Sequence, residues 1–318
     1  MPAPTLFDYS DHSPYSNPGT HAGFFSELST EPDALHRFAC SAVVHYRADG
    51  PALTEAQKAD PDRRWLTSIL DAAEARAPLD GPRTLAQQVA GCCRDHTLIS
   101  LGVLRTHGIP ARSRIGFATY FTPGWNSDHV VGERWDGERW VRFDPELGQE
   151  DFDFDVHDMP TGPESPFQTA AEAWLAIRAG TADADRYGVG PDAPHLSGKD
   201  FVRQYVLLEV AHRHRDELLL WDIWGPQLGA PDLQEAGGRQ VGTWIRESGL
   251  PGTDTSDAEF DAVADELAYL LVAADAGDDE AADQLAELYR EDVRLHPGER
   301  VLTLSPTGHA GITDLAAH

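Results

Sequence analysis

Two short segments on either side of an Asp-Gly pair constrain the fold of this chain more than any other feature. They cover residues 129–135 and 138–143, and Asp136-Gly137 separates them. Asp-Gly is favoured in two-residue β-hairpin loops because both loop residues need positive φ. With that loop, His129 would lie directly opposite Asp144. Opposed residues have Cβ atoms roughly 4.5–5.5 Å apart, so the pattern predicts an imidazole beside a carboxylate.

A candidate nucleophile precedes the hairpin. Residues 91–95 read Gly-Cys-Cys-Arg-Asp, and residues 94–107 have the apolar spacing of a buried helix that stops at Gly-Ile-Pro. Cys93 would then lie at the helix N-terminus, where free N–H groups and the helix dipole favour a thiolate. We therefore expect rapid alkylation of Cys93 below neutral pH. A thiol, a base and an orienting acid, here Cys93, His129 and Asp144, are the groups needed for nucleophilic acyl transfer.

These segments resemble the transglutaminase-like superfamily of papain-type cysteine enzymes. The resemblance rests on Cys-Arg-Asp at 93–95 and on Leu-Arg-Thr-His-Gly-Ile-Pro-Ala-Arg at 104–112, and it is strong over residues 85–148. It assigns the nucleophile to Cys93 rather than Cys92, the base to His129 and the orienting acid to Asp144. More weakly, two other segments resemble bacterial transglutaminase-like domain proteins, namely residues 15–19 and 221–225.

The chain departs from the family pattern at two places. Val130-Val131 stands where Ala-Trp is common, so a tryptophan beside the base is not expected. His96 occupies a position where an aromatic residue is commoner, which makes it a candidate for the substrate cleft. Its alternative interpretation is a helix-surface or hydrogen-bonded core residue.

The resemblance implies an α+β fold with a papain- or transglutaminase-like core, in which N-terminal helices pack on an antiparallel sheet. We place this core at residues 15–150 and a mainly helical C-terminal region at residues 165–318. Residues 149–167, rich in Asp, Pro and Gly, form the expected linker. Expected helices, read from apolar periodicity and capping signals, are residues 30–46, 60–76, 170–179, 198–214 and 257–276. Residues 112–121 are expected to form the first strand of the core.

For the oxyanion hole and the substrate cleft, the sequence offers candidate residues with more than one interpretation. An oxyanion hole would use the Cys93 N–H and a side-chain donor, for which Gln87 and Gln88 are candidates by sequence distance. Each could equally be a surface glutamine. Trp221 and Trp224 could form a wall of the substrate cleft, or simply the packing contact between the two halves of the chain.

A metal site is a weak alternative. Cys92, Cys93 and His96 could be zinc ligands, but adjacent cysteines span a tetrahedral site poorly and no second Cys or His pair completes it. We therefore expect neither a metal nor a cofactor. Three cysteines, two of them adjacent, do not make a disulfide framework, which agrees with a cytoplasmic protein.

The composition restricts the partners. Fifty-three acidic and 25 basic residues give a formal net charge of −28. Such a charge repels nucleic acid and anionic membranes and concentrates cationic ligands, although acidity also serves solubility. No apolar run is long enough to span a bilayer. We expect a small-molecule or peptide amide substrate, with cationic substrates favoured by the charge, and the sequence leaves the oligomeric state open.

The predicted reaction is acyl transfer through a thioester. The resemblance implies amide substrates, because members of the superfamily cleave peptides or small amides, or join glutamine to amines. Amide or peptide hydrolysis is the first interpretation. Transamidation or amide-bond formation with an amine, in a bacterial small-molecule pathway, is the second. A non-catalytic binding protein on the same fold is the third, and an intact triad argues against it.

Overall fold

The central element of the fold is a five-stranded sheet. The computed structural model describes residues 5–47, 53–162, 165–230 and 238–316; residues 163–164 of the expected linker and 231–237 of the expected C-terminal region lie outside this part. Four antiparallel strands follow the order β5-β4-β3-β6, and the short β7 runs parallel to the start of β4. The expected α+β class is therefore confirmed. The strands are β3 (Ala111–Ala118), β4 (Asn126–Trp135), β5 (Trp140–Phe143), β6 (Phe167–Thr169) and β7 (Tyr187–Gly188).

The β4–β5 hairpin has a different register from the predicted one. Trp135 pairs with Trp140, so the loop contains four residues rather than two. The Asp136 side chain explains the longer loop, because its Oδ1 accepts hydrogen bonds of 2.8 Å from the N–H groups of Glu138 and Arg139. The register moves by two residues, which keeps every side chain on its predicted face because the side-chain period of a strand is two. His129 and Asp144 are therefore diagonal neighbours on one face instead of direct partners.

Helix α5 (Cys93–Thr106) is buried on all sides and packs against β3, β4 and α3. It begins at Cys93, one residue before the predicted start, so the cysteine lies at the helix N-terminus as expected. It ends before Gly108, which has a φ of 70° and whose neighbour Ile109 donates its N–H to the Leu104 carbonyl at 3.0 Å. The burial of the whole helix fixes the position of its first residue relative to the sheet.

A parallel strand pair at the start of α5 was not predicted. The expected helix over residues 30–46 ends at Ala42, and the β-branched Val43 and Val44 continue as strand β1 (Val43–His45). β1 pairs with β2 (Val89–Gly91), which leads directly to Cys92. This pairing brings residues 45–47 beside the start of α5.

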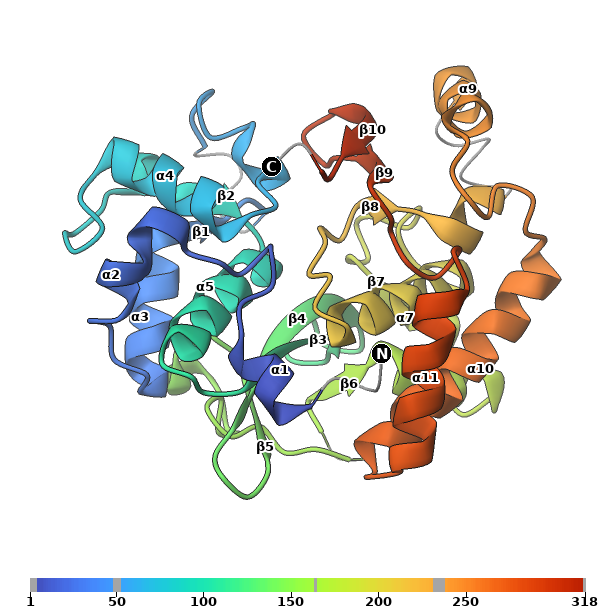
Figure 1. Cartoon of the computed structure of the whole chain (residues 1–318), viewed down its shortest axis with the longest axis horizontal. Helices are drawn as coiled ribbons and strands as arrows, with labels where there is room; N and C mark the ends of the chain where they lie inside the picture. Colours follow the sequence, from blue (N-terminus) through green and yellow to red (C-terminus); the bar gives the residue numbers. More distant parts are fainter. Residues whose placement is uncertain (1–4, 48–52, 163–164, 231–237, 317–318) are drawn as a thin grey trace.

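Most of the other N-terminal helices lie on the side of α5 away from the C-terminal region (Figure 1), and the first of them, at residues 6–10, lies toward that region. Two of them follow the predicted helices in residues 30–46 and 60–76 with shorter bounds, and the two at residues 6–10 and 22–25 were not predicted. They are α1 (Leu6–Ser10), α2 (Ala22–Phe25), α3 (Pro32–Ala42) and α4 (Leu66–Arg76), with 3-10 turns η1 (Gly19–His21), η3 (Asp60–Asp62) and η4 (Leu85–Gln87).

The C-terminal region contains the three expected helices and more. Capping boxes begin α6, with Thr169 and Glu172, and α10, with Ser256 and Glu259. Helices α9 and α11 and a three-stranded antiparallel sheet, in the order β10-β9-β8, were not predicted. The expected linker contains η5 (Gln149–Asp151). Besides β6 and β7, the elements of the C-terminal region are α6 (Ala170–Arg178), η6 (Ala184–Arg186), α7 (Lys199–Arg213), β8 (Asp222–Ile223), η7 (Gly225–Gly229), α9 (Gly238–Ser248), α10 (Asp257–Asp275), α11 (Asp279–Glu291), β9 (Arg300–Leu304) and β10 (Ala310–Asp314).

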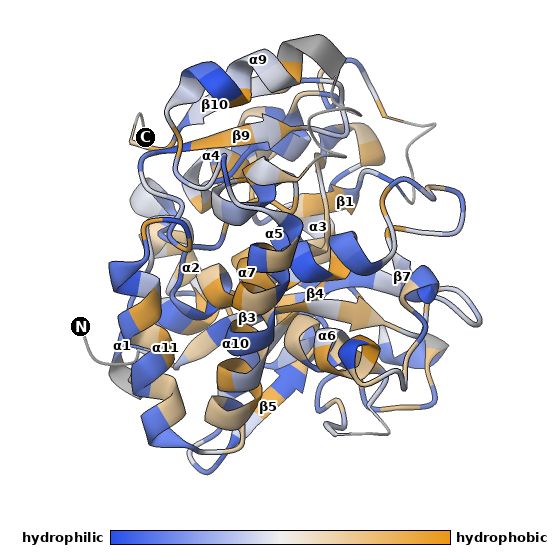
Figure 2. Ribbon diagram, turned by 90° about the vertical axis from the view of Figure 1, so that its right-hand side faces the viewer, coloured by the Kyte–Doolittle hydropathy of each residue, from blue (hydrophilic) through white to orange (hydrophobic). Residues whose placement is uncertain are grey.

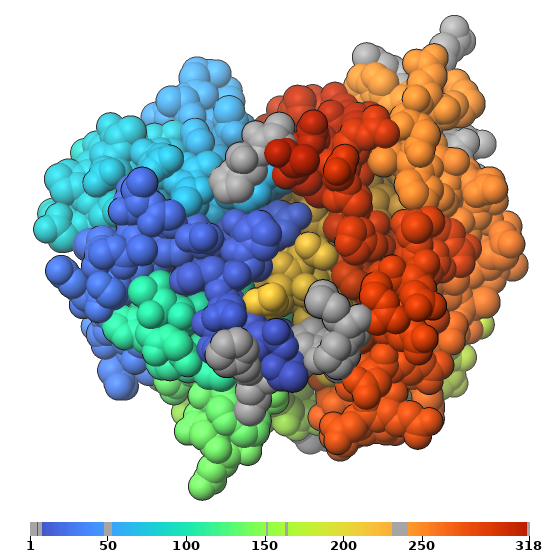
Figure 3. Space-filling model, viewed as in Figure 1, coloured from blue at the N-terminus to red at the C-terminus, as the bar shows by residue number. Residues whose placement is uncertain are grey.

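One hydrophobic cluster joins the two regions. It contains buried residues of α3, α5 and β3 together with residues of α6, α7 and α10, and Figure 2 shows apolar segments gathered around β3, β4 and α7. The two halves of the chain also lie side by side on the surface (Figure 3). A buried ion pair connects them, because the Arg64 guanidinium donates to both Asp222 carboxylate oxygens, at 3.0 and 2.6 Å. Within the described residues, no helix is both long and apolar enough to cross a membrane.

Candidate active site

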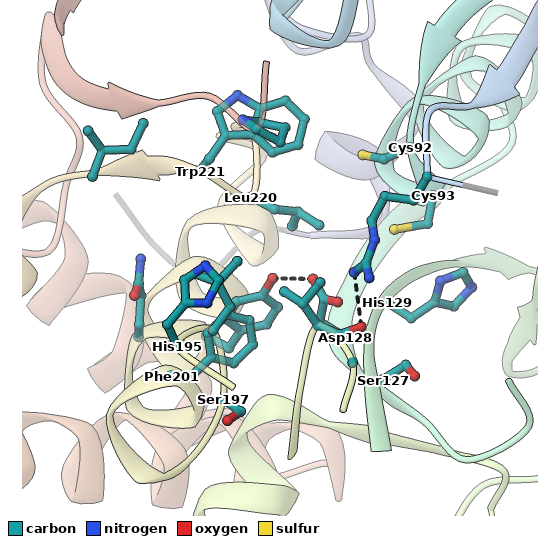
Figure 4. Close-up of a pocket in the computed structure, with 18 of the residues that line it drawn as sticks. Cys92, Cys93, Ser127, Asp128, His129, His195, Ser197, Phe201, Leu220 and Trp221 are labelled. Atoms are coloured by element: carbon teal, nitrogen blue, oxygen red, sulfur yellow. Dashed lines mark hydrogen bonds between the residues drawn. The ribbon is translucent and has the colours of Figure 1, made fainter. Parts of the chain in front are cut away.

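The candidate residues meet at a cavity of about 840 Å³ between the two regions. Cys92 and Cys93 reach it from the start of α5, and Asp128 and His129 from the start of β4. The first turns of α7 and the segment around Trp221 line it from the C-terminal region. In Figure 4 the two cysteines and His129 are on one side, and His195 and Phe201 are on the other. The volume lies within the usual range for sites that enclose a small molecule.

The neighbours of Cys93 hold it at the helix start. Asp95 caps the helix, since its Oδ2 accepts the Cys92 N–H at 2.8 Å. Arg94, 1% exposed, pairs with Asp95 at 2.9 Å and donates to the carbonyls of Arg64 and Glu217. Gly91 allows the close approach, because a Cβ there would lie 2.5 Å from Asp95 Oδ2. The Cys-Arg-Asp motif thus fixes the place of the thiol.

His129 and Asp144 form a hydrogen-bonded pair. The His129 Nε2 lies 2.6 Å from Asp144 Oδ2, and the Asp144 side chain is fully buried. Two further donors hold this carboxylate: the Tyr120 hydroxyl at 2.7 Å and the Glu146 N–H at 3.0 Å. An ionised carboxylate only accepts, so Nε2 carries the proton. The Nδ1 atom of His129 is then the ring nitrogen that can exchange a proton.

The pair shifts both ionisations toward the charged forms. Burial by itself would lower the pKa of His129, but the negative charge of Asp144 and the hydrogen bond to it outweigh burial and raise that pKa above its ordinary value. Burial would likewise raise the pKa of Asp144, yet the charge of His129 and the donors around the carboxyl hold it below its usual range. Asp144 is therefore ionised at neutral pH.

The thiol behaves differently from the prediction. A hydrogen bond between the Cys93 and Cys92 side chains, burial, and the negative charges of Glu146 and Asp128 together raise the pKa of Cys93 well above its ordinary value. This direction is opposite to the lowered pKa on which the expected rapid alkylation below neutral pH rests, and the alkylation itself stays a prediction. The resting thiol is protonated, and a base must remove its proton during the reaction.

The predicted side chains of the oxyanion hole lie elsewhere. The Gln87 Oε1 accepts from the N–H and the hydroxyl of Thr84 at 3.0 and 2.9 Å. The Gln88 side-chain amide donates to the Cys40 carbonyl at 2.6 Å. Neither glutamine lines the cavity, so this prediction was wrong for both. Gln87 and Gln88 are close to Cys93 in the sequence, but Gln87 ends the turn η4 and Gln88 lies between that turn and strand β2. These elements direct the two side-chain amides to structural contacts away from the cavity.

Two of the three predicted cleft residues do not line the cavity. His96 is buried, and its ring nitrogens contact the carbonyls of Cys92 and Val43 at 3.0 and 3.3 Å. Trp224 is also buried and donates its ring N–H to the Leu295 carbonyl at 3.0 Å. Both are packing residues, which was the alternative interpretation. Trp221 does line the cavity, while its ring N–H donates to Asp62 at 2.9 Å.

Several residues around the site were missed in the sequence. Tyr120 and Phe121 follow β3 and place aromatic rings against the His129 imidazole, with ring centres 5.9 and 4.9 Å away. Tyr46 and Asp128 line the cavity beside Cys93. The sequence did contain signals for three of them. Tyr120 and Phe121 are adjacent aromatic residues after a core strand, and Asp128 is an acid directly before the base. The signal for Tyr46 was hidden, since it depends on the unpredicted β1–β2 pair.

The described residues contain no group of three or more His, Cys, Asp and Glu side chains placed to hold a metal ion. The two nitrogens of His96 are already engaged with backbone carbonyls. The Cys92, Cys93 and His96 set therefore does not form a ligand cluster.

Comparison with known proteins agrees with the resemblance seen in the motif. Residues 46–145 match the model of the family described as the transglutaminase-like superfamily. A crystal structure of a "putative cysteine protease" from Cytophaga hutchinsonii is similar at 17% sequence identity with a TM-score of 0.31, over 44% of this chain and 42% of that chain. The similarity thus spans less than half of either chain. No curated protein matches this sequence.

Proposed function

We propose that this transglutaminase-like domain protein, a cysteine-dependent enzyme of that superfamily, hydrolyses an amide or peptide bond through a thioester on Cys93. One observation carries the proposal. A buried thiol at a helix start lines the same cavity as an imidazole that is hydrogen-bonded at 2.6 Å to a fully buried carboxylate. These are the nucleophile, base and orienting acid of covalent acyl transfer.

The steps follow from the protonation states. His129 Nδ1 takes the Cys93 thiol proton as Sγ attacks the carbonyl carbon, and Asp144 stabilises the imidazolium that results. His129 returns the proton to the departing nitrogen as the C–N bond breaks, which leaves a thioester and a free amine. Water then attacks the thioester while His129 takes its proton. The carboxylic acid leaves, and the Cys93 thiol is restored.

Two donors are assigned to the developing oxyanion. The N–H of Cys93 is at the first helical position, where it has no partner within the helix. Tyr46 lines the cavity. Burial raises the pKa of its hydroxyl, and the nearby Cys92, Asp128 and Cys93 raise it further. The hydroxyl therefore keeps its proton and remains a hydrogen-bond donor. Loss of one oxyanion donor costs about 10²–10³-fold in kcat. Tyr46→Phe should show a loss of that order once a substrate is in hand.

The decisive experiment is intact-mass detection of a covalent adduct after incubation with a metabolite extract. We expect an acyl adduct on the wild-type enzyme, none on Cys93→Ala, and an adduct on the matched control Cys92→Ala. Chasing the adduct in H₂¹⁸O or in buffer with glycine ethyl ester separates hydrolysis from transfer to an amine. An active Cys93→Ala variant, or an adduct that maps to Cys92, would refute the assignment.

A further inference from the structure

A half-buried carboxylate near the nucleophile has no role in the proposed chemistry. Asp128 precedes the base on β4 and lines the cavity with Cys93. Figure 4 draws it between the cysteines and the wall that carries His195 and Phe201. The hydrogen bond that the structure gives its side chain comes from the Tyr205 hydroxyl, at 2.5 Å. A carboxylate has about four acceptor positions, and this bond occupies one of those on Asp128.

The cations of the cavity are committed to other acids. Arg47 pairs with Asp192 at 3.3 Å. Lys199 bonds to Asp261, and Arg203 pairs with Asp261 at 2.7 Å and with Asp257 at 3.2 Å. Within the described ranges, no Lys, Arg or His nitrogen lies within 4.0 Å of the Asp128 carboxylate as an ion-pair partner.

The negative charge of Glu146, the other acid near the thiol, already has a positive partner in His96. Its Oε2 lies 3.9 Å from the His96 Nδ1. The charge of Glu146 raises the pKa of His96 to about 10, against the lowering effect of burial. His96 is therefore protonated at neutral pH. Among the described residues, Asp128 remains the acid of the site without an ion-pair partner within 4.0 Å, and the charges of His129, Arg47 and His45 act on it from a greater distance.

Unpartnered polar atoms on the cavity wall are mainly acceptors. Gln227 is 3% exposed, and its Oε1 has no hydrogen-bond partner, while its amide nitrogen donates to the Gln204 carbonyl. Glu146 Oε2 also lacks a hydrogen bond, and Arg203 Nε is the one unpartnered donor among the buried lining atoms of the described chain. Burying an acceptor without a donor costs about 1–3 kcal/mol.

Aromatic rings complete the surroundings of Asp128. Tyr205 stacks on Phe201 with ring centres 4.4 Å apart, and Tyr46 packs edge-on against Trp221 at 6.0 Å. All four residues line the cavity. Aromatic faces attract cations through the ring quadrupole. An aromatic enclosure with one unpaired carboxylate is a setting suited to a protonated nitrogen.

We propose that Asp128 anchors a protonated nitrogen of the substrate, so that the enzyme acts on amides carrying an ammonium or amidinium group near the reacting carbonyl. The inference rests on the proposed function for the role of Cys93 and names the substrate class of that same site. Asp128 accepts from the cation directly, and Tyr205 positions the carboxylate.

The anchoring has a consequence for the nucleophile. The charge of Asp128 is one of the causes that raise the pKa of Cys93. A bound cation neutralises that charge and lowers the cost of forming the thiolate. Substrates of the proposed class would therefore help to activate the group that attacks them, and neutral amides would not.

The first test measures the preference of Cys93 for cationic reagents without turnover. The probes are methyl methanethiosulfonate, which is neutral, and its cationic 2-(trimethylammonium)ethyl analogue. Both are applied to the Cys92→Ser enzyme. Peptide mass mapping measures how fast each probe labels Cys93. Both probes react with the same thiolate, so the ratio of their rates is independent of thiol ionisation. We expect this ratio to exceed that of a free thiol and to fall about tenfold, for loss of one nearby charge, in Asp128→Asn.

The matched control is Glu138→Gln, which removes one negative charge at the exposed tip of the β4–β5 hairpin and should leave the ratio unchanged. Asparagine at 128 keeps an acceptor for Tyr205, and a thermal unfolding curve checks that the variant is folded. A ratio equal to that of a free thiol, or one unaffected by Asp128→Asn, overturns the proposal.

The second test asks for binding. Agmatine should protect Cys93 from iodoacetamide, 1,4-butanediol at the same concentration should not, and Asp128→Asn should abolish the difference. Equal protection by both compounds would overturn the cation site even if the rate ratio behaved as expected. Neither test requires an acyl adduct, so failure of the proposed hydrolysis and failure of the cation site are seen in separate experiments.

Discussion

At the scale of single residues, Cys92 is one of several neighbours that raise the pKa of Cys93. The hydrogen bond between the two thiol side chains is the largest cause of the raised pKa of Cys93, ahead of burial and the nearby carboxylates. The adjacent cysteine thus affects the chemistry of the nucleophile. It stabilises the protonated nucleophile and so leaves activation to His129.

Cys92→Ala should therefore lower the pKa of Cys93. Each pKa unit corresponds to a tenfold change in thiolate, so we expect iodoacetamide to label Cys93 roughly tenfold faster at pH 7 in this variant. The pH dependence of labelling, followed by mass spectrometry, measures the shift. Cys40→Ala is the control, because Cys40 contacts His36 and the carbonyls of Pro145 and Glu146 instead. An unchanged profile in Cys92→Ala would show that burial alone sets the thiol pKa.

Asp144 is a positioning residue, and its loss should be visible in both rate and pH profile. Asp144→Asn removes the charge that stabilises the His129 imidazolium and can hold the wrong tautomer, so we expect a loss on the order of 10²–10⁴-fold in kcat. In the wild type, kcat/KM should rise with pH through a pKa above 6.5, because the base must be neutral and its pKa is raised. That acid limb should move to lower pH in Asp144→Asn, since the raising charge is gone.

Tyr120→Phe changes the surroundings of the Asp144 carboxylate without removing its charge, and so serves as a comparison for Asp144→Asn. It removes one donor at 2.7 Å and leaves the contact with His129. We expect a smaller loss of rate and an acid limb close to that of the wild type. A near-normal rate in Asp144→Asn would mean that another group orients the imidazole.

At the scale of elements, the start of α5 is built as one unit with β2. Asp95 caps the helix and pairs with Arg94, and Gly91 makes room for that carboxylate. The position of the nucleophile therefore depends on a buried network and not only on helix propensity. Such networks are costly to break because the remaining partner stays buried.

Asp95→Ala should lower the free energy of unfolding by about 3 kcal/mol, the usual cost of leaving one member of a buried pair alone. Asp95→Asn keeps an acceptor for the Cys92 N–H and should cost clearly less. Urea unfolding followed by circular dichroism measures both. Equal stability of the alanine and wild-type proteins would contradict a structural role for the motif.

At the scale of the whole molecule, the C-terminal region completes the core. Strands β6 and β7 pair with β3 and β4, and α7 packs against β3. Phe117 of β3 contacts the rings of Tyr187, Phe201 and Tyr205. The region also supplies Tyr205 and Trp221 to the cavity. The boundary expected between residues 150 and 165 thus crosses a continuous sheet and a continuous hydrophobic cluster.

A fragment ending at residue 162 should be insoluble or inactive. It would expose the face that α6, α7 and α10 cover and would lose one wall of the cavity, and large exposed apolar patches lead to aggregation. Expression trials with size-exclusion chromatography measure this, and the full-length chain from the same vector is the control. A soluble 1–162 fragment with full activity and unchanged substrate preference would contradict the prediction.

The sequence by itself determined the local features of this protein. The helix that begins at Cys93, the stop at Gly108, the capping boxes of α6 and α10, and a shared face for His129 and Asp144 all follow from short-range signals that act within a few residues. The face was correct although the hairpin register was not, because a shift of two residues preserves the alternation of a strand.

Only the tertiary structure decided the environment of the thiol and the shape of the cavity. The pKa of Cys93, the diversion of Gln87 and Gln88 to other contacts, and the places of His96 and Trp224 in the core depend on neighbours distant in the chain. The β1–β2 pair and the packing of α7 on β3 bring Tyr46, Asp128 and Tyr205 to one cavity. Burial and electrostatic effects are sums over such neighbours, and a linear pattern of residues does not contain them.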